Sequence, residues 1–108
     1  MSSEEKMYQT IGQNIFYYRL KERLSVEDLS ERIAKDQEVT IPVSELQEFE
    51  LGTAIFEIGA LLTIAEALRI HPATLLRKHS FFNFLMDFGK EQIQAYFLFE
   101  ERTSDYKS

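Results

Sequence analysis

Residues 11–33, IGQNIFYYRLKERLSVEDLSERI, carry the clearest indication of the fold class of this chain. Its apolar residues recur at steps of three and four, which is the pattern of helices with one buried face. Ile11 and Ile15 mark that face in a first helix, and Phe16 and Tyr17 lie off it. The stretch therefore predicts an all-α protein.

A second helix is expected to begin at Ser25, because its hydroxyl can accept hydrogen bonds from the first N–H groups of a helix. Leu29 and Ile33 give that helix its buried face. The polar residues 34–40, AKDQEVT, show no apolar periodicity and predict a loop. Pro42, whose fixed φ suits a first helical turn, then opens a third helix.

The third helix is expected to end at Gly52 and to point Leu46 and Phe49 inward. Its outer side is left to Val43, Ser44, Gln47, Glu48 and Leu51. A fourth helix from about Phe56 and a short fifth helix after Pro72 follow. The residues that the fourth helix is expected to bury are Ile58, Leu61, Leu62, Ala65 and Leu68.

From Ser80 onward the chain holds six of its nine phenylalanines. A closed five-helix core has limited surface for them, so we expect an aromatic-rich helical extension that serves self-association or a heterologous partner. We therefore divide the chain into a domain over residues 1–78 and a C-terminal segment over residues 79–108. The expected interface residues are Phe81, Phe82, Phe84, Leu85, Phe88, Tyr96, Phe97 and Phe99.

The amino-acid composition limits the functions and cellular compartments that we expect for this protein. Twelve basic and 18 acidic side chains leave a formal charge of −6, a poor overall match to a polyanion such as DNA. The absence of cysteine suits a reducing cytoplasm and excludes disulfides and thiolate metal sites. The polar N-terminus does not have the pattern of a signal peptide, and no run of about 18 apolar residues could span a membrane. We expect a soluble, cytoplasmic protein.

The sequence contains no motif that is typical of an enzyme or of a metal-binding protein. His71 and His79 lack the i, i+4 spacing of a helical zinc pair, and there is no glycine-rich phosphate loop. The scattered carboxylates fall on solvated helix positions that suggest no pocket for acid–base chemistry. We expect neither catalysis nor a cofactor.

Two ungapped blocks resemble the Xre/Cro-like helix-turn-helix family of DNA-binding repressors. The first block is Ile11-Gly12, Ile15, Arg19, Leu24-Ser25 and Leu29. The second comprises Ile41, Leu46, Phe49-Glu50, Gly52, Ile58, Leu61-Leu62, Ile64-Ala65, Ala67-Leu68, Ile70 and Leu75. The resemblance covers residues 11–76 and implies a five-helix, lambda-repressor-like domain. The predicted loop between the second and third helices is about six residues longer than the family's tight turn, which a fold tolerates at low cost.

The resemblance also implies which residues would act on DNA. The third helix of this family enters the major groove, which places the base-reading side chains at Val43, Ser44, Gln47 and Glu48. Arg19 and Glu50 occupy positions where relatives form an internal ion pair, so a structural role is implied for both. The candidates for phosphate contacts are Lys21, Arg23, Ser25, Arg32, Lys35 and Thr53.

The charge around the third helix leaves two hypotheses open. From Lys35 to Glu57 one lysine is set against six carboxylates, a balance of −5 that is the reverse of a basic footprint. The first hypothesis is a sequence-specific transcriptional regulator that binds double-stranded DNA as a homodimer. The alternative is a helix-turn-helix domain repurposed as a protein-interaction module, such as an antirepressor or a DNA mimic, with little or no DNA binding.

Overall fold

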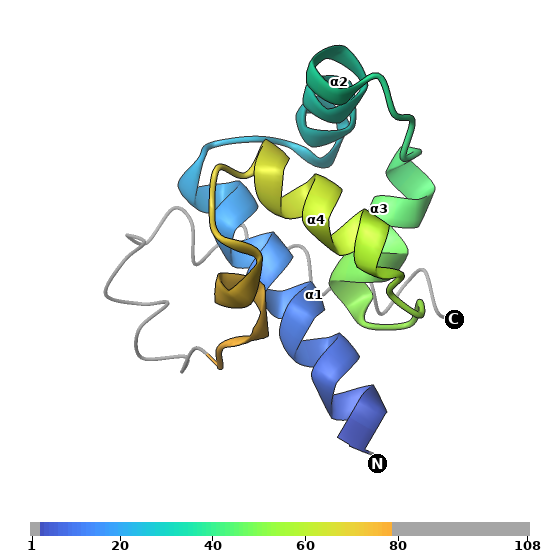
Figure 1. Ribbon diagram of the computed structural model, residues 1–108, viewed down its shortest axis with the longest axis vertical. Helices are drawn as coiled ribbons and strands as arrows, with labels where there is room; N and C mark the ends of the chain where they lie inside the picture. Colours follow the sequence, from blue (N-terminus) through green and yellow to red (C-terminus); the bar gives the residue numbers. More distant parts are fainter. Residues whose placement is uncertain (1–2, 79–108) are drawn as a thin grey trace. The chain divides into compact units, whose positions relative to one another are not determined.

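The computed structural model describes residues 3–78, which belong to the first of two units of the chain, Met1–Lys78 and His79–Ser108. Over the described residues the fold is all-helical (Figure 1). The elements are α1 (Ser3–Lys21), α2 (Val26–Gln37), α3 (Val43–Leu51), α4 (Ile58–Ala67) and a 3-10 helix, η1 (Pro72–Leu76). The predicted interface residues Phe81, Phe82, Phe84, Leu85, Phe88, Tyr96, Phe97 and Phe99 lie outside the described residues.

The core forms where α1 packs against α3 and η1 while α2 packs against α3 and α4. Each helix presents aliphatic side chains to this centre, so the elements bury their apolar faces against one another. The chain also returns on itself, because η1 packs against both α1 and α4. The buried core residues are Ile11, Ile15, Val26, Leu29, Ile33, Ile41, Leu46, Phe49, Ile64, Ala65, Ala67, Leu68 and Leu75.

Helix α2 begins as predicted but ends later. Ser25 caps it, and the helix then continues through Gln37, so the predicted loop over residues 34–40 is wrong for its first four residues. The additional turn is solvated on most sides and shows no apolar period, yet the Gln37 amide nitrogen donates to the Thr63 carbonyl at 2.9 Å. The chain leaves the helix at Glu38, whose φ of 56° is left-handed. Only residues 38–42 therefore connect α2 to α3. Residues 34–37, which the sequence assigned to the loop, belong to α2.

Helix α4 buries a different face from the one predicted. Ala65 and Leu68 are buried as expected, but Ile58 is 76% exposed and Leu62 is 48% exposed. Ile64 takes their place in the core. The segment is apolar on almost every side, so its periodicity does not determine which face turns inward.

Helix α1 contacts the rest of the domain on more than one side. Phe16 and Tyr17, which the sequence placed off the inner face, are both buried. Asn14 is buried as well, and its amide nitrogen donates to the carbonyls of Leu75, at 2.7 Å, and Arg77. The Asn14 contact with Leu75 lies where α1 packs against η1, and an apolar stripe along α1 does not reveal it.

Candidate functional site

The outer face of α3 is the candidate functional surface. Ser44, Gln47 and Glu48 are exposed, as the sequence predicted for the outer side of the third helix. Within the described part of the chain their side chains make no hydrogen bond or ion pair. Val43 differs, because it is half-buried and packs against the core. The face that α3 offers to a partner is therefore polar and acidic.

Local sequence determines where α3 starts, stops and points. Pro42 precedes the helix with a φ of −63°, and Leu46 and Phe49 anchor it to the core. Gly52 ends the helix at a left-handed φ of 73°, and its N–H donates to the Phe49 carbonyl at 3.0 Å. Thr53, a predicted phosphate contact, lies at this end and donates its hydroxyl to the Glu48 carbonyl at 3.2 Å.

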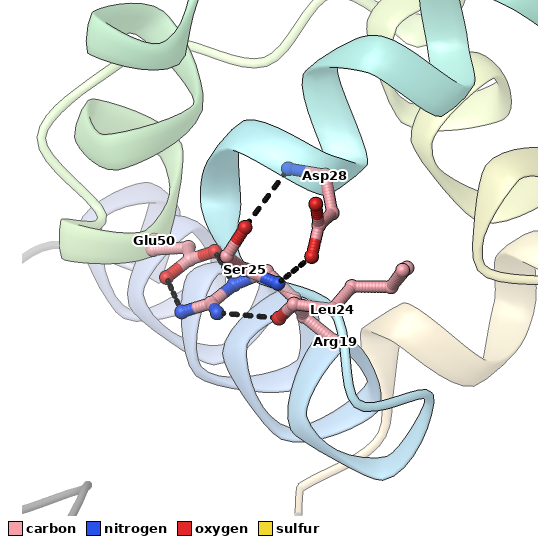
Figure 2. Close-up of polar contacts among 5 residues, drawn as sticks. All are labelled: Arg19, Leu24, Ser25, Asp28 and Glu50. Atoms are coloured by element: carbon pink, nitrogen blue, oxygen red, sulfur yellow. Dashed lines mark hydrogen bonds and ion pairs between the residues drawn. The ribbon is translucent and has the colours of Figure 1, made fainter.

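An ion pair behind α3 joins it to α1 (Figure 2). Arg19 Nε donates to Glu50 Oε2 at 2.7 Å and Nη2 donates to Oε1 at 2.9 Å, a two-pronged contact. Arg19 Nη1 also donates to the Leu24 carbonyl at 2.9 Å, next to the start of α2. Burial raises the pKa of Glu50, and the Arg19 guanidinium opposes that rise. The two residues meet as the resemblance implied, and Arg19 also fixes the entry to α2.

Close approach of two backbones provides a second attachment between α1 and α3. A Cβ atom on Gly12 would overlap the Phe49 carbonyl oxygen and lie 2.7 Å from that of Glu50. No side chain larger than hydrogen fits there without moving main-chain atoms. No local signal in the sequence reveals this role, because the close contact joins residues that lie far apart in the chain. Together with the ion pair, it holds the candidate surface rigidly from behind.

Four of the six predicted phosphate contacts lie near the junction of α1 and α2: Lys21, Arg23 and Ser25 are close in sequence, and Arg32 reaches Glu22 between them. Lys21 and Arg23 are exposed at the end of α1, and Lys35 is exposed near the end of α2. Arg32 is engaged within the domain. Its Nη1 donates to the Ala67 carbonyl at 3.0 Å and lies 3.6 Å from Glu22 Oε1. One guanidinium nitrogen of Arg32, Nη1, is therefore engaged in internal contacts.

Ser25 also has an internal role, as the cap of α2 (Figure 2). Its Oγ accepts from the Asp28 N–H at 3.0 Å, and Asp28 Oδ2 accepts from the Ser25 N–H at 3.0 Å. This reciprocal pair is a capping box, which satisfies two N–H groups at the start of the helix. A hydroxyl used in this way has less freedom to reach a phosphate.

The electrostatics around α3 remain acidic after burial is taken into account. Glu50 is withdrawn into its ion pair, so from Lys35 to Glu57 one exposed lysine remains against five exposed carboxylates, a balance of −4. The five are Asp36, Glu38, Glu45, Glu48 and Glu57. Outside this range, exposed basic side chains lie in α1, at Lys6 and Lys21, and after α1, α4 and η1, at Arg23, Arg69, Arg77 and Lys78.

The capping box predicts acid sensitivity. The hydrogen bonds from the backbone and side chain of Ser25 lower the pKa of Asp28, so the folded protein favours its ionised form. This contribution is complete above the ordinary aspartate pKa of about 4 and disappears as the pH falls through the lowered value. We expect Asp28→Asn to flatten the loss of stability between about pH 5 and pH 2 in urea unfolding. Asp36→Asn, at the other end of α2, is the control; equal pH profiles for the two variants would contradict the assignment.

No protein-family model, curated protein or solved structure matches the chain. Among residues 3–78, no helix is long and apolar enough to cross a membrane. The same residues contain no cluster of three or more His, Cys, Asp or Glu side chains that could hold a metal ion.

Proposed function

We propose that this protein is a sequence-specific DNA-binding transcriptional regulator whose residues 1–78 form a lambda-repressor-like helix-turn-helix domain of the Xre/Cro-like family. In this proposal α2 and α3 are the helix-turn-helix pair and η1 is the fifth helix. The regulator acts in the cytoplasm as a homodimer, joined through residues 79–108, and requires no cofactor.

The main support for the proposal is that the outer side of α3 is exposed. Its exposed side includes Ser44 and Gln47, two neutral side chains that hydrogen-bond to base edges, and neither is used within the domain. The helix is braced from behind by Gly12 and by the Arg19 guanidinium. A reader of base edges needs such support, because specific recognition depends on side chains held at fixed positions.

The chemistry of the exposed face indicates how DNA would be read. The Gln47 amide can pair with both N6 and N7 of adenine, while the Glu48 carboxylate can accept from N4 of cytosine. Glu45 and Glu48 would also repel phosphates, so nonspecific affinity should be weak. Attraction to the DNA backbone would come from Lys35, Lys21 and Arg23, which are exposed on neighbouring segments.

Replacing Gln47 by alanine should relax base preference without unfolding the domain. Loss of one paired contact with adenine costs about 1–3 kcal/mol of discrimination. The measurement is selection from a random-sequence duplex library, followed by fluorescence anisotropy on the enriched site at several salt concentrations. Gln13→Ala, an exposed glutamine on α1, is the matched control and should leave the preference unchanged.

Two results of this experiment would count against the proposal. One is no binding to any duplex at low salt, where even a nonspecific reader binds. The other is equal loss of preference in Gln47→Ala and Gln13→Ala. Lys35→Ala should instead weaken binding to all sequences and reduce the salt slope by about 1, as expected for a phosphate contact.

A second candidate function is favoured by the acidic balance of −4 between Lys35 and Glu57. Such a face complements a basic surface, so the domain could act as a protein-interaction module that competes with DNA for a basic partner. Recovery of a stoichiometric basic protein from the native host, lost in a Glu45→Gln, Glu48→Gln variant, would support it. Recovery of DNA alone would favour the first function.

A further inference from the structure

A side-chain hydrogen bond joins α2 to the chain just before α3. Ser30, a half-buried residue of α2, donates from Oγ to the Ile41 carbonyl at 2.7 Å. Ile41 lies in the connection over residues 38–42, immediately before Pro42 (Figure 1). Among residues 39–41, all of which the structure describes, no other main-chain group takes part in a hydrogen bond. Ser30 therefore makes the one hydrogen bond that holds this part of the connection.

The orientation of the Ile41 carbonyl controls the direction in which α3 leaves the connection. A peptide unit is planar, so a held carbonyl fixes the orientation of the whole unit between Ile41 and Pro42. The Pro42 ring sets the next torsion, with a φ of −63°. The Pro42 carbonyl then accepts from the N–H groups of Glu45, at 3.0 Å, and Leu46, at 3.1 Å, which limits the remaining torsion, ψ. Each link from Ser30 to the first turn of α3 is therefore constrained.

Apolar packing does not supply this control. The Ile41 side chain is buried and Leu46 is fully buried, so both hold the start of α3 against the core. Such contacts are non-directional, whereas a hydrogen bond weakens steeply when its angle changes. The hydrogen bond from Ser30 therefore adds a fixed orientation to a contact that packing alone leaves adjustable.

Helix α2 is itself a firm reference for that orientation. Leu29 and Ile33, on either side of Ser30 in the sequence, are fully buried. Two side chains of α2, those of Arg32 and Gln37, also donate to main-chain carbonyls of α4. Through Ser30, the start of α3 is therefore held relative to a helix that is joined to the body of the domain.

We propose that Ser30 is a positioning residue, whose hydrogen bond to Ile41 sets the angle between α2 and α3. Gly12 and Arg19 attach α3 to α1 near the C-terminal end of α3, and Ser30 holds the opposite end. The consequence for DNA rests on the proposed function: the angle of α3 aligns its exposed side chains with base edges, so Ser30 determines specificity without touching DNA.

The effect of Ser30 is greatest at the start of α3. Ser44 lies six residues before Glu50, and Gln47 lies three residues before it. At a rise of about 1.5 Å per residue, these separations are about 9 Å and about 4.5 Å along the helix. A tilt about the attachment at Glu50 therefore moves Ser44 about twice as far as Gln47.

Pairs of spin labels on the full chain test the positioning without DNA. The protein has no cysteine, so two introduced thiols carry all the labels. One pair is Glu31→Cys with Glu45→Cys, and the other is Glu31→Cys with Glu48→Cys; all three positions are exposed. Dilution with unlabelled protein restricts the measured distances to those within one chain. Adding Ser30→Ala should broaden the first distance distribution at least about twice as much as the second, because Glu45 is farther from Glu50.

Ser30→Thr and Gln37→Ala are the matched variants. Threonine keeps the hydroxyl, so Ser30→Thr should restore the narrow distribution. Gln37→Ala removes another side-chain hydrogen bond of α2, but one that ends on α4, and it should leave both distributions unchanged. If Ser30→Ala did not broaden the first distribution, or if Gln37→Ala broadened it equally, the proposal would be overturned.

DNA binding provides the second measurement. On the duplex enriched by selection, Ser30→Ala should weaken binding about fivefold, which corresponds to one neutral hydrogen bond lost from the arrangement that binds. Affinity for a random-sequence duplex should stay within about twofold, because attraction to phosphates does not require a fixed helix angle. Equal losses on both duplexes would contradict the effect on specificity. If the unsubstituted protein bound no duplex, the proposed function would fail, and the spin labels would still decide whether Ser30 positions α3.

Discussion

Glu50→Ala should destabilise the protein by about 3–5 kcal/mol, the cost of leaving a buried charge without its partner. The Glu50 side chain is 0% exposed, and it receives two hydrogen bonds from Arg19. Once the carboxylate is removed, the guanidinium keeps one of its three hydrogen bonds, to the Leu24 carbonyl, and its position over the Phe16 ring. The loss is measured by urea unfolding at neutral pH, followed by circular dichroism.

Two further variants make this experiment decisive. Glu45→Ala, on the exposed side of the same helix, should change stability by less than about 0.5 kcal/mol. The double variant Arg19→Met, Glu50→Leu should recover most of the lost stability, because an apolar pair of similar size replaces the two charges together. If Glu50→Ala were no more destabilising than Glu45→Ala, the pair would not be stabilising α3.

Gly12→Ala should destabilise the protein toward the upper end of the range of about 1–3 kcal/mol seen for overpacked cores. The atoms that the new methyl group would meet are the main-chain oxygens of Phe49 and Glu50. A side chain could rotate away from such a clash, whereas these carbonyls can move only if α3 moves with them. The expected results are a lower midpoint of urea unfolding and a lower affinity for any ligand that binds α3.

Gly59→Ala is the control for this prediction, because its added Cβ meets no atom within 4 Å. At low protein concentration it should be neutral or stabilise the fold by up to about 1 kcal/mol, since alanine favours a helix over glycine. The two substitutions add the same methyl group to two helices. Similar effects from both would show that helix propensity, and not the close approach of α1 to α3, determines the outcome.

Features determined by local chemistry were predictable from the sequence. Ser25 was expected to cap α2 because of its hydroxyl, and Gly52 was expected to end α3 because glycine adopts a left-handed φ without strain. Leu46 and Phe49 were expected inward because they are three residues apart on a helix whose other side is polar. The exposure of Ser44 and Gln47 follows from the same periodicity.

Features determined by tertiary packing were not predictable in this way. Ile58 and Leu62 were expected in the core, but α4 is apolar nearly all round and the contacts of α2 and η1 decide which side is buried. Asn14 gave no local sign of its burial, because its acceptor at Leu75 lies 61 residues away in the chain. The last turn of α2 was missed because a solvated turn tied by Gln37 needs no apolar repeat.

The two attachments between α1 and α3 have a mechanical consequence. Gly12 and Arg19 are seven residues apart on α1, so the attachments are separated by about 10 Å along its axis. Both attachments meet α3 at Phe49 and Glu50, so they anchor α3 to α1 at one place, near the C-terminal end of α3. A signal that tilts α3 would therefore displace its N-terminal end, which follows residues 38–42, more than the end that carries Phe49 and Glu50.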